Sequence, residues 1–582
     1  MVNNRYELLK GIKLVRKASE YKVKGDGNLD LVIGVDFGSD SARAVVIDAK
    51  DGHKEGEGIC EYPRWMEGRY CDSSRGMFRQ HPKDYIEALE QSVREALEDA
   101  GPDAGKKIRA LSVDTTGSTP CPVDGNGIPL ALLPEFSDNP HAMFYLWKDH
   151  TAIAEAAEIN EALSNFEGED YTRFQGTYSS EWYWAKILHG VRTDAKVRKR
   201  AYSWVEHCDW IPGMLTGQME PDTMYRCSCA AGHKALWHSD FDGLPSAKCL
   251  GNVDPYLGTV IKRYVSEPRT SVHPVGKITK EWAGRLGLNE DVVIGGSSLD
   301  AHAGAVGAGI KPGILVKVVG TSTVDMLVNT REDLRGSDLK DCCGQAEDSI
   351  IPGYIGMEAG QAAFGDIYSW YRRLLMWPVK ELACQMGMAG KEKEQYIAMM
   401  QKELINKLCQ DAMELDDDAD LIVLDWFNGR RYPMINESVK GAVSGLTLGT
   451  SAVSLFRAIV LSTVFGSRRI FDSFITRGIK INEVITVGGI PKRSPLVMQM
   501  MADVLKRPIK VARSEQACAQ GAAMYAAAAA GIYTDLLEAQ EHMVEGFERI
   551  YTPDVKMFGK YDILYKKYLS LGRHIEQMQG DM

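Results

Sequence analysis

Apolar and polar residues follow the same pattern in two stretches that lie far apart in the chain. Residues 31–48 (LVIGVDFGSDSARAVVID) hold two β-rich runs around a turn of Gly, Ser and Asp. Residues 314–328 (ILVKVVGTSTVDMLV) repeat this arrangement around a turn of Gly and hydroxyl side chains. Such runs, bounded by turn residues, predict β-hairpins, the first with Asp36 at its turn. The recurrence indicates a duplicated fold.

Strand and helix patterns fill the rest of the chain. Residues 85–100 have the apolar spacing of an amphipathic helix, and residues 109–114 (RALSVD) have that of a strand. Residues 482–489 (NEVITVGG) predict a strand that enters a double-glycine turn, and residues 495–506 predict the helix after it. Residues 390–420 are charged and helical in pattern, which is typical of a solvated insertion. Together these elements predict an α/β fold.

Length and composition set the scale of this fold. A chain of 582 residues is too long for one compact core, so we expect two large domains with a cleft between them. The first thirty residues mix charges without an apolar stretch, so they do not predict a secretory signal. The most apolar later stretches are too short to cross a bilayer. We therefore expect a cytoplasmic protein with no membrane partner.

Charge and cysteine usage narrow the class of function. The net charge of −11, without a dense Lys/Arg block, argues against nucleic acid as a partner. The twelve cysteines contain no CxxC motif and no matching metal-ligand spacing, so we expect reduced, mostly buried thiols.

The two hairpin turns allow two interpretations. Backbone N–H groups and small hydroxyl side chains in such turns can hold phosphate oxygens, and a carboxylate such as Asp36 can hold Mg²⁺. The alternative is a tight turn made of ordinary turn-forming residues, but two such turns in one chain favour phosphate binding. The sequence has neither the GxxxxGK[ST] pattern nor the protein-kinase motifs. If ATP is used, another architecture holds it.

Asp300 stands where a predicted strand meets a helix made almost wholly of Ala and Gly, within residues 291–309. A carboxylate there could accept the proton of a hydroxyl that attacks a γ-phosphate. The alternative is that Asp300 only caps the helix, and both can hold at once.

Several blocks of the sequence resemble, in the same order, those of L-ribulokinases, a branch of the FGGY carbohydrate kinases in the actin-like ATPase superfamily. The resemblance covers residues from about 31 to about 530. The blocks are residues 34–44, 114–120, 142–152, 178–189, 206–217, 231–238, 298–309, 316–327, 356–370, 424–433 and 487–490.

The resemblance implies two actin-like (ribonuclease H-like) α/β domains with a central cleft. Residues 30–310 would bind sugar and supply the catalytic base. Residues 311–550 would bind the nucleotide and carry the helical insertion near residues 390–420. Residues 1–29 would be an N-terminal extension, and residues 551–582 a C-terminal tail.

The implied activity is ATP-dependent phosphorylation of L-ribulose to L-ribulose 5-phosphate in L-arabinose catabolism. The partners would be ATP and a ketopentose, and the sequence leaves a homodimer open. The alternatives are a kinase for D-ribulose, xylulose or ribitol, or a non-catalytic sugar-sensing ATPase of the same fold.

The resemblance also implies roles for individual residues. Asp36 would organise Mg²⁺, and Asp300 would be the general base. The sugar-binding residues would be Thr116, Gly117, Lys234, Asp300 and Glu358. The nucleotide-binding residues would be Gly38, Ser39, Gly320, Thr321, Ser322, Thr323, Asn428, Gly429, Gly488 and Gly489.

Four further residues could belong to the site, but a structural role is the alternative for each of them. Trp182, Trp184 and Trp210 could form walls of a sugar pocket, but core packing is the preferred interpretation for each of them. His302 is expected to support the site rather than to act as a base, because Asp300 already fills that role.

Overall fold

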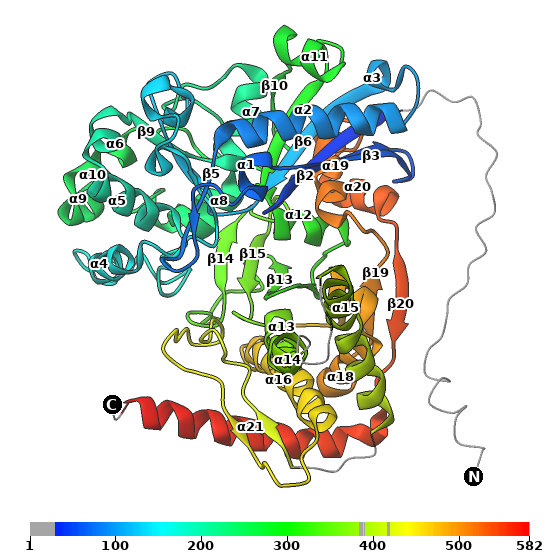
Figure 1. The fold of residues 1–582 in the computed structure, drawn as a ribbon. Helices are drawn as coiled ribbons and strands as arrows, with labels where there is room; N and C mark the ends of the chain where they lie inside the picture. Colours follow the sequence, from blue (N-terminus) through cyan, green and yellow to red (C-terminus); the bar gives the residue numbers. More distant parts are fainter. Residues whose placement is uncertain (1–29, 383–387, 389, 416–419, 581–582) are drawn as a thin grey trace.

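The computed structural model describes residues 30–382, 388, 390–415 and 420–580. The N-terminal extension predicted at residues 1–29 lies outside the described residues. The rest of the chain forms two halves, one above the other in Figure 1, each built on a β-sheet with helices packed against it. This is the α/β architecture that the sequence predicts.

The first sheet has six strands in the order β10-β11-β6-β1-β2-β3. Strand β1 is buried at every position, and it pairs in parallel with β6 and antiparallel with β2. A strand covered on both faces has a continuous apolar run instead of an alternating one, as in LVIGVDF. The strands are β1 (Leu31–Phe37), β2 (Ser41–Asp48), β3 (Lys54–Glu61), β6 (Ile108–Thr115), β10 (Pro274–Lys277) and β11 (Val293–Leu299).

Helices from distant parts of the chain cover the two faces of this sheet. Helix α2 (Pro82–Asp99) packs on β2 and β3, and the Ala-rich helix α19 (Ala517–Ala529) packs on β1, β6 and β11. Any side chain at Gly34 of β1 would collide with the carbonyl oxygen of Ala519, so a glycine is needed where this helix approaches. The strands before residue 310 therefore form one sheet and those after it form the other, but a helix from after residue 310 packs on the first sheet. The domain limits stay a prediction.

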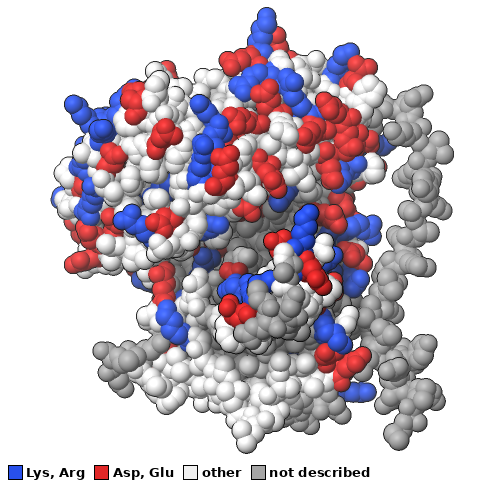
Figure 2. All heavy atoms as spheres, viewed as in Figure 1, with Lys and Arg blue, Asp and Glu red and all other residues white. Residues whose placement is uncertain are grey.

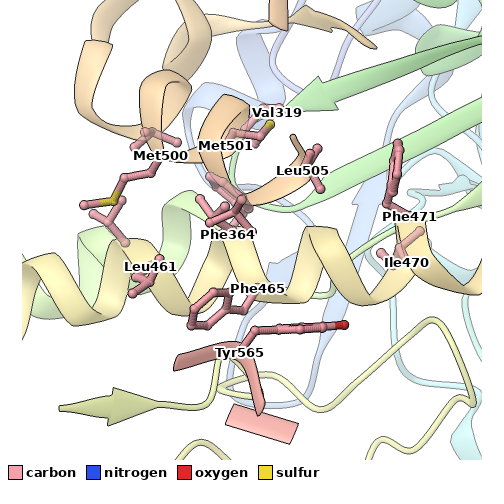
Figure 3. Packing of buried hydrophobic residues seen from close by; sticks show 14 of the residues in the cluster. Val319, Phe364, Leu461, Phe465, Ile470, Phe471, Met500, Met501, Leu505 and Tyr565 are labelled. Carbon is pink, nitrogen blue, oxygen red and sulfur yellow. The ribbon is translucent and has the colours of Figure 1, made fainter. Parts of the chain in front are cut away.

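The second sheet has seven strands in the order β14-β15-β13-β12-β18-β19-β20. Its core is filled from helices α16 (Ala452–Thr476) and α18 (Pro495–Leu505). Figure 3 shows Phe465 beside Tyr565, and Met501 on the other side of α16. The strands are β12 (Ile314–Val319), β13 (Thr323–Asn329), β14 (Gly344–Glu347), β15 (Ile355–Ala359), β18 (Glu483–Val487), β19 (Ile509–Ala512) and β20 (Phe547–Tyr551).

The remaining helices complete both halves, and several of them form a lobe beside the first sheet, at the left of Figure 1. In the first half they include α4 (Ile153–Leu163), α5 (Tyr183–Thr193), α7 (His207–Thr216), α8 (Ser228–Ala235), α9 (Ala247–Val253), α10 (Pro255–Lys262) and α12 (Asp300–Gly307). In the second half they include α13 (Gly365–Leu375), α15 (Gly390–Glu414), α16 (Ala452–Thr476), α17 (Gly489–Arg493), α18 (Pro495–Leu505), α20 (Leu536–Met543) and α21 (Phe558–Gly580).

The two predicted hairpins are confirmed as β1–β2 and β12–β13. The placement of Asp36 at the first turn is wrong, because Asp36 lies within β1. Its backbone still pairs in register with Arg43 of β2 and Asp114 of β6, and the turn begins only after Phe37.

The predicted insertion forms helix α15, which buries Leu408 and Ala412 while most of its other described residues are half-buried or exposed. Residues 416–419 of the predicted segment lie outside the described part. On the face shown in Figure 2, acidic and basic side chains are interspersed, and a hollow separates the upper half from the lower. Among the described residues no helix has the length and apolar character needed to cross a membrane.

The segment given as a C-terminal tail carries structure of its own. Helix α21 buries Tyr561, Leu564, Tyr565 and Tyr568 against the second half. The Tyr568 hydroxyl also donates a hydrogen bond of 2.7 Å to the buried Asp425. The tail therefore contributes to the core of this half.

Replacing Tyr568 with Ala should lower the free energy of unfolding by about 3 kcal/mol or more, because it leaves a cavity and removes a partner of Asp425. Ile563 lies on the same helix and is 58% exposed, so Ile563→Ala should change stability by no more than about 0.5 kcal/mol. Denaturant unfolding of both variants would check this. Equal stabilities would mean that α21 is not part of the core.

Candidate active site

Three carboxylates meet where neighbouring parallel strands end. Asp36 near the end of β1 is the register partner of Asp114 near the end of β6. On the other side of β6, β11 ends at Leu299, and Asp300 begins helix α12. Parallel strands have their carboxyl ends at the same edge of a sheet, where ligand sites of such sheets usually lie.

The Asp36–Asp114 pair is buried without enough compensating charge. Both carboxylate oxygens of Asp114 lack a hydrogen-bond partner among the described residues. Burial, together with Asp36 and Asp300, raises the pKa of Asp114 well above its usual range. Burial also raises the pKa of Asp36, although Arg43 at 3.4 Å partly offsets it. A cation bound between the two carboxylates would remove this cost.

The donor atoms of this pair fit a hard cation. Asp36, Asp114 and Cys518 each place one ligand atom within 4.8 Å of the others. Carboxylate oxygens are the protein ligands that Mg²⁺ prefers, so the two aspartates suit the magnesium site that the sequence places at Asp36. The sequence analysis missed Asp114 as a ligand. The signal that could have found it is an Asp at the end of the strand predicted next to the first hairpin.

Asp300 is the first residue of α12, whereas Leu299 holds the cap position. Its Oδ1 accepts a hydrogen bond of 2.6 Å from the backbone N–H of Ala301, so it also stabilises the helix start. Burial, and then the charge of Asp36, raise the pKa of Asp300 to about 7. A base with such a pKa is well matched to proton transfer near neutral pH.

A cavity of about 560 Å³ opens between the two halves in front of Asp300. It gathers seven of the sixteen predicted site residues, from both halves. The predicted residues that do not line it are Asp36, Gly38, Ser39, Thr116, Thr323, Asn428, Gly429, Gly488 and Gly489. Seven predicted residues line it, together with Glu181, Arg431 and His302, which were not among the predicted binding residues. The seven are Gly117, Lys234, Asp300, Gly320, Thr321, Ser322 and Glu358.

Lys234 and Glu358 form the polar end of this cavity and join the two halves. The Lys234 ammonium, on α8, lies 3.3 Å and 3.4 Å from the two carboxylate oxygens of Glu358, on β15. Burial alone would raise the pKa of Glu358, but Lys234, His302 and His233 hold it well below its usual range. A fixed donor and a fixed acceptor side by side can bind the hydroxyl groups of a polyol.

The loop after β6 brings Gly117 to the cavity. A side chain at Gly117 would displace the end of the side chain of Leu299, the residue before Asp300, so a glycine fits most easily here. Thr116 is buried and shares a hydrogen bond of 3.0 Å with Thr119. It therefore supports the loop without lining the cavity.

Two buried charged residues that the sequence analysis missed hold this loop. The Lys186 ammonium, on α5, donates hydrogen bonds to the carbonyl oxygens of Ser118 (2.8 Å) and Leu146 (2.9 Å). Glu206 accepts one of 2.7 Å from the backbone N–H of Thr119. Burial lowers the pKa of Lys186 to about 7 and raises that of Glu206 to about 7. The hydrophobic pattern gives no signal for either residue, because their partners are distant in sequence.

The turn after β12 lies on the other side of the cavity. The carbonyl oxygen of Thr321 accepts hydrogen bonds from the backbone N–H groups of Phe364 (2.7 Å) and Asp366 (3.1 Å), at the start of α13. Thr323 begins β13 and is buried. Gly488 has a φ of 113°, and a side chain there would lie 2.5 Å from the carbonyl oxygen of Val319, so it packs against the end of β12.

The other predicted nucleotide residues lie at varied distances from the cavity. Gly38 closes the first turn with a hydrogen bond of 3.0 Å from its N–H to the carbonyl oxygen of Ser41. Ser39 accepts one of 2.9 Å from the indole of Trp147, which lines the cavity. Asn428 is exposed, and Gly429 lines a separate small cavity. Their roles, and that of Gly489 at the start of α17, stay predictions.

Of the three tryptophans, one lies on the wall of the cavity and two are packed in the cores. Trp182 lines the cavity, and its ring lies 5.4 Å from the Lys234 ammonium. Trp184 and Trp210 are fully buried in the cores, as the preferred interpretation expects. His302 lines the cavity beside Glu358 and is nearly completely buried.

The fold agrees with that of sugar kinases. The model of the FGGY family of carbohydrate kinases, C-terminal domain, matches residues 315–530. The xylulose kinase of Rhodospirillum rubrum has a similar structure, with a TM-score of 0.74 at 19% identity, covering 94% of this chain and 99% of that one. The glycerol kinase of Plasmodium falciparum, solved with ADP, gives a TM-score of 0.72 at 15% identity over 94% of this chain and 99% of its own. These likenesses establish the two-domain actin-like fold.

Two relatives with higher sequence identity show which branch of the FGGY carbohydrate kinases the chain belongs to. The ribulokinase of Vibrio parahaemolyticus is 43% identical over 549 residues, covering 94% of this chain and 96% of the relative. The ribulokinase of Anoxybacillus flavithermus is 35% identical over 567 residues, covering 95% of each. The chain belongs to the ribulokinase family of FGGY carbohydrate kinases.

Asp300→Asn should reduce kcat by about 10²–10⁴-fold, because Asn cannot accept the proton. The pKa of Asp300 lies above its unfolded value, so its ionisation destabilises the fold as the pH rises through about 7. The variant should therefore melt at or above the wild-type temperature at pH 8. Steady-state rates and melting curves on the same preparation check both points. A stable variant with the wild-type rate would leave Asp300 only its helix-terminal role.

Asp36→Asn and Thr321→Ala should lower kcat far more than they raise the dissociation constant of the sugar. Thr321 lies in the turn assigned to phosphate, and Asp36 belongs to the carboxylate cluster assigned to the metal. Calorimetric titration with sugar alone, next to kinetics with ATP, separates the two effects. Near-normal turnover in both variants would place the nucleotide elsewhere.

Proposed function

We propose that this protein transfers the γ-phosphoryl group of ATP to the terminal hydroxyl of L-ribulose, giving L-ribulose 5-phosphate and ADP. One observation carries the proposal. Asp300 lines a single cavity, together with the Lys234–Glu358 pair and the Gly320–Ser322 turn. A base, a polyol-binding pair and a phosphate-binding turn are the parts that such a transfer needs.

The reaction follows from the positions of these groups. Lys234 and Glu358 hold sugar hydroxyls so that the terminal hydroxyl faces Asp300. As its oxygen attacks the γ-phosphorus, Asp300 takes the proton, and the bond from the γ-phosphorus to the bridging oxygen breaks to release ADP. The backbone N–H groups of the turn stabilise charge on the transferred phosphoryl group. Asp36 and Asp114 would hold Mg²⁺, which supplies positive charge to neutralise the phosphates.

The structure around the reacting groups supports pre-organisation. Asp300, Lys234 and Glu358 lie on regular elements, and Lys186 and Glu206 fix the loop that carries Gly117. Sites held by helices and strands keep their geometry better than sites on free loops. The cytoplasmic location and a homodimer stay predictions alongside this function.

A panel of L-ribulose, D-ribulose, xylulose and ribitol tests the substrate, with ADP release as the measurement. We expect the highest kcat/KM with L-ribulose. A higher value for another sugar would reassign the substrate within the kinase class. Nucleotide binding without ADP release for any sugar would favour a sensor.

Lys234→Met and Glu358→Gln should each raise the KM for L-ribulose, because a buried polar group that loses its partner costs about 1–3 kcal/mol. Discrimination among the sugars should weaken in parallel. Ile153→Ala, which changes an apolar residue of the same cavity that is 61% exposed, serves as the control. Wild-type kcat/KM across the panel in both polar variants would exclude these residues from sugar binding.

A further inference from the structure

A pair of imidazoles lies beside Glu358 and takes no part in the proposed phosphoryl transfer. His233 comes from α8 and His302 from α12, while Glu358 comes from β15 of the other half. Each of the three residues places one ligand atom within 4.8 Å of the others. The two rings lie 4.9 Å apart, measured between their centroids.

Both imidazoles are buried, yet most of their nitrogen atoms are unpaired. The two side chains are 1% exposed. Nδ1 of His233 and both ring nitrogens of His302 have no hydrogen-bond partner within the part of the chain that the structure describes. Buried polar atoms are nearly always paired, and each orphan costs about 1–3 kcal/mol. The three nitrogen atoms are therefore candidates for binding a ligand.

The hydrogen-bond pattern allows Nδ1 of His233 to offer a lone pair. The Ser349 hydroxyl lies 3.1 Å from the carbonyl oxygen of Ala346 and 3.1 Å from Nε2 of His233. In the tautomer with the hydrogen on Nε2, the hydroxyl donates to Ala346 and accepts from Nε2, and Nδ1 is an acceptor. Burial lowers the pKa values of both histidines, that of His302 to about 4, so both rings are neutral.

We propose that His233, His302 and Glu358 form a binding site for a divalent transition metal of the zinc class. Neutral imidazoles with a carboxylate are the donors that such ions prefer, whereas Mg²⁺ prefers oxygen donors and water. Nε2 of His302 lies 3.3 Å from Oε2 of Glu358, without the alignment of a hydrogen bond. Because His302 and Glu358 line the cavity, a fourth position is open to water.

Lys234 sets the strength of this site. Its ammonium contacts both oxygens of Glu358, so a bound metal must share the carboxylate with a positive charge. Repulsion between the two cations lowers the affinity of the wild-type site. Removal of the ammonium should therefore tighten metal binding, which a purely sugar-binding role of the histidines does not predict.

The metal should also exclude the sugar, because Glu358 and Lys234 belong to the sugar-binding end of the cavity. This second part rests on the proposed function, whereas the metal site itself does not. The ion would act as an inhibitor that competes with the sugar and not with ATP.

Titration with Co²⁺, read by its absorption bands and by calorimetry in excess Mg²⁺, tests the metal site. The titration is done on the Asp36→Asn protein, which lacks one ligand of the Asp36–Asp114–Cys518 cluster. The remaining Co²⁺ signal then comes from binding at the two histidines. We expect one Co²⁺ per chain. His233→Ala and His302→Ala should weaken binding at least tenfold, as should His302→Phe, which fills the space of the ring. Lys234→Met should tighten it.

Melting curves of each variant without metal confirm that it folds. Absence of Co²⁺ binding in the Asp36→Asn protein, or binding that none of the three histidine variants weakens, would overturn the site. Zn²⁺ inhibition of the wild type that does not diminish with rising L-ribulose would overturn the exclusion. If the wild type fails to phosphorylate any sugar, the proposed function is lost, while the Co²⁺ titration still decides the metal site.

Discussion

The packing of three carboxylates at one edge of a parallel sheet is the constraint on which this site depends. Asp36 and Asp114 are neighbours in register on β1 and β6, and Asp300 follows β11 on the other side of β6. Like charges this close and this buried are costly, and the pKa values of all three are raised. A cation bound between Asp36 and Asp114, as proposed above, would offset this cost.

An Ala-rich helix packs on the sheet beside these carboxylates. Helix α19 approaches β1 so closely that Gly34 can carry no side chain, and small residues allow this approach. This contact seals one face of the sheet and brings Cys518 next to Asp36 and Asp114. Exclusion of water from that side keeps the electrostatic interactions among the carboxylates strong.

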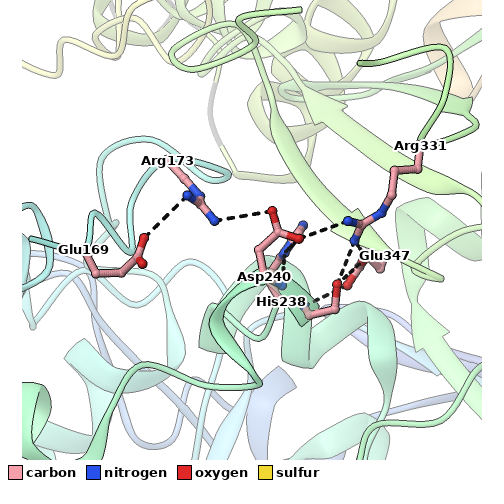
Figure 4. A network of polar contacts seen from close by, with 7 residues as sticks. Glu169, Arg173, His238, Asp240, Arg331 and Glu347 are labelled. Atoms are coloured by element: carbon pink, nitrogen blue, oxygen red, sulfur yellow. Dashed lines mark hydrogen bonds and ion pairs between the residues drawn. The ribbon is translucent and has the colours of Figure 1, made fainter. Parts of the chain in front are cut away.

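The two halves are joined around the cavity by charged groups from both. Lys234 and Glu358 meet inside it, and Arg431 donates to Glu181 at 3.0 Å on its wall. Farther out, Figure 4 shows Arg331 of the second half bonded to Asp240 of the first, at 3.0 Å. The exposed pairs contribute little individually. The buried ones matter more, because loss of one partner leaves a charge without compensation.

More of the local fold than of the site could be predicted from the sequence. Both hairpins, the strand at residues 109–114 and the helix start at Asp300 were predictable, because each depends on a short pattern of apolar and turn residues. Asp36 was misplaced into the turn since nothing in the pattern shows that the ladder runs on to Phe37.

Contacts between distant residues could not be predicted in this way. The role of Asp114 needs the register of two strands that are far apart in sequence. Lys186 lies within an apolar stretch, and its partners are backbone oxygens from two loops, which leave no mark on the sequence. The sequence gives no signal that distinguishes Trp182 from Trp184 and Trp210. Only the structure shows that Trp182 lines the cavity while the other two are buried in the cores.

The coupling among the carboxylates also orders the events of the reaction. After burial, the charge of Asp36 is the main cause that raises the pKa of Asp300. Neutralisation of Asp36 and Asp114 by a bound cation would therefore lower the pKa of Asp300 and leave it ionised at neutral pH. Without that cation, part of the Asp300 population holds a proton already and cannot accept another. The strand register that brings the carboxylates together would thus make the proposed base competent once a metal occupies the Asp36–Asp114 pair.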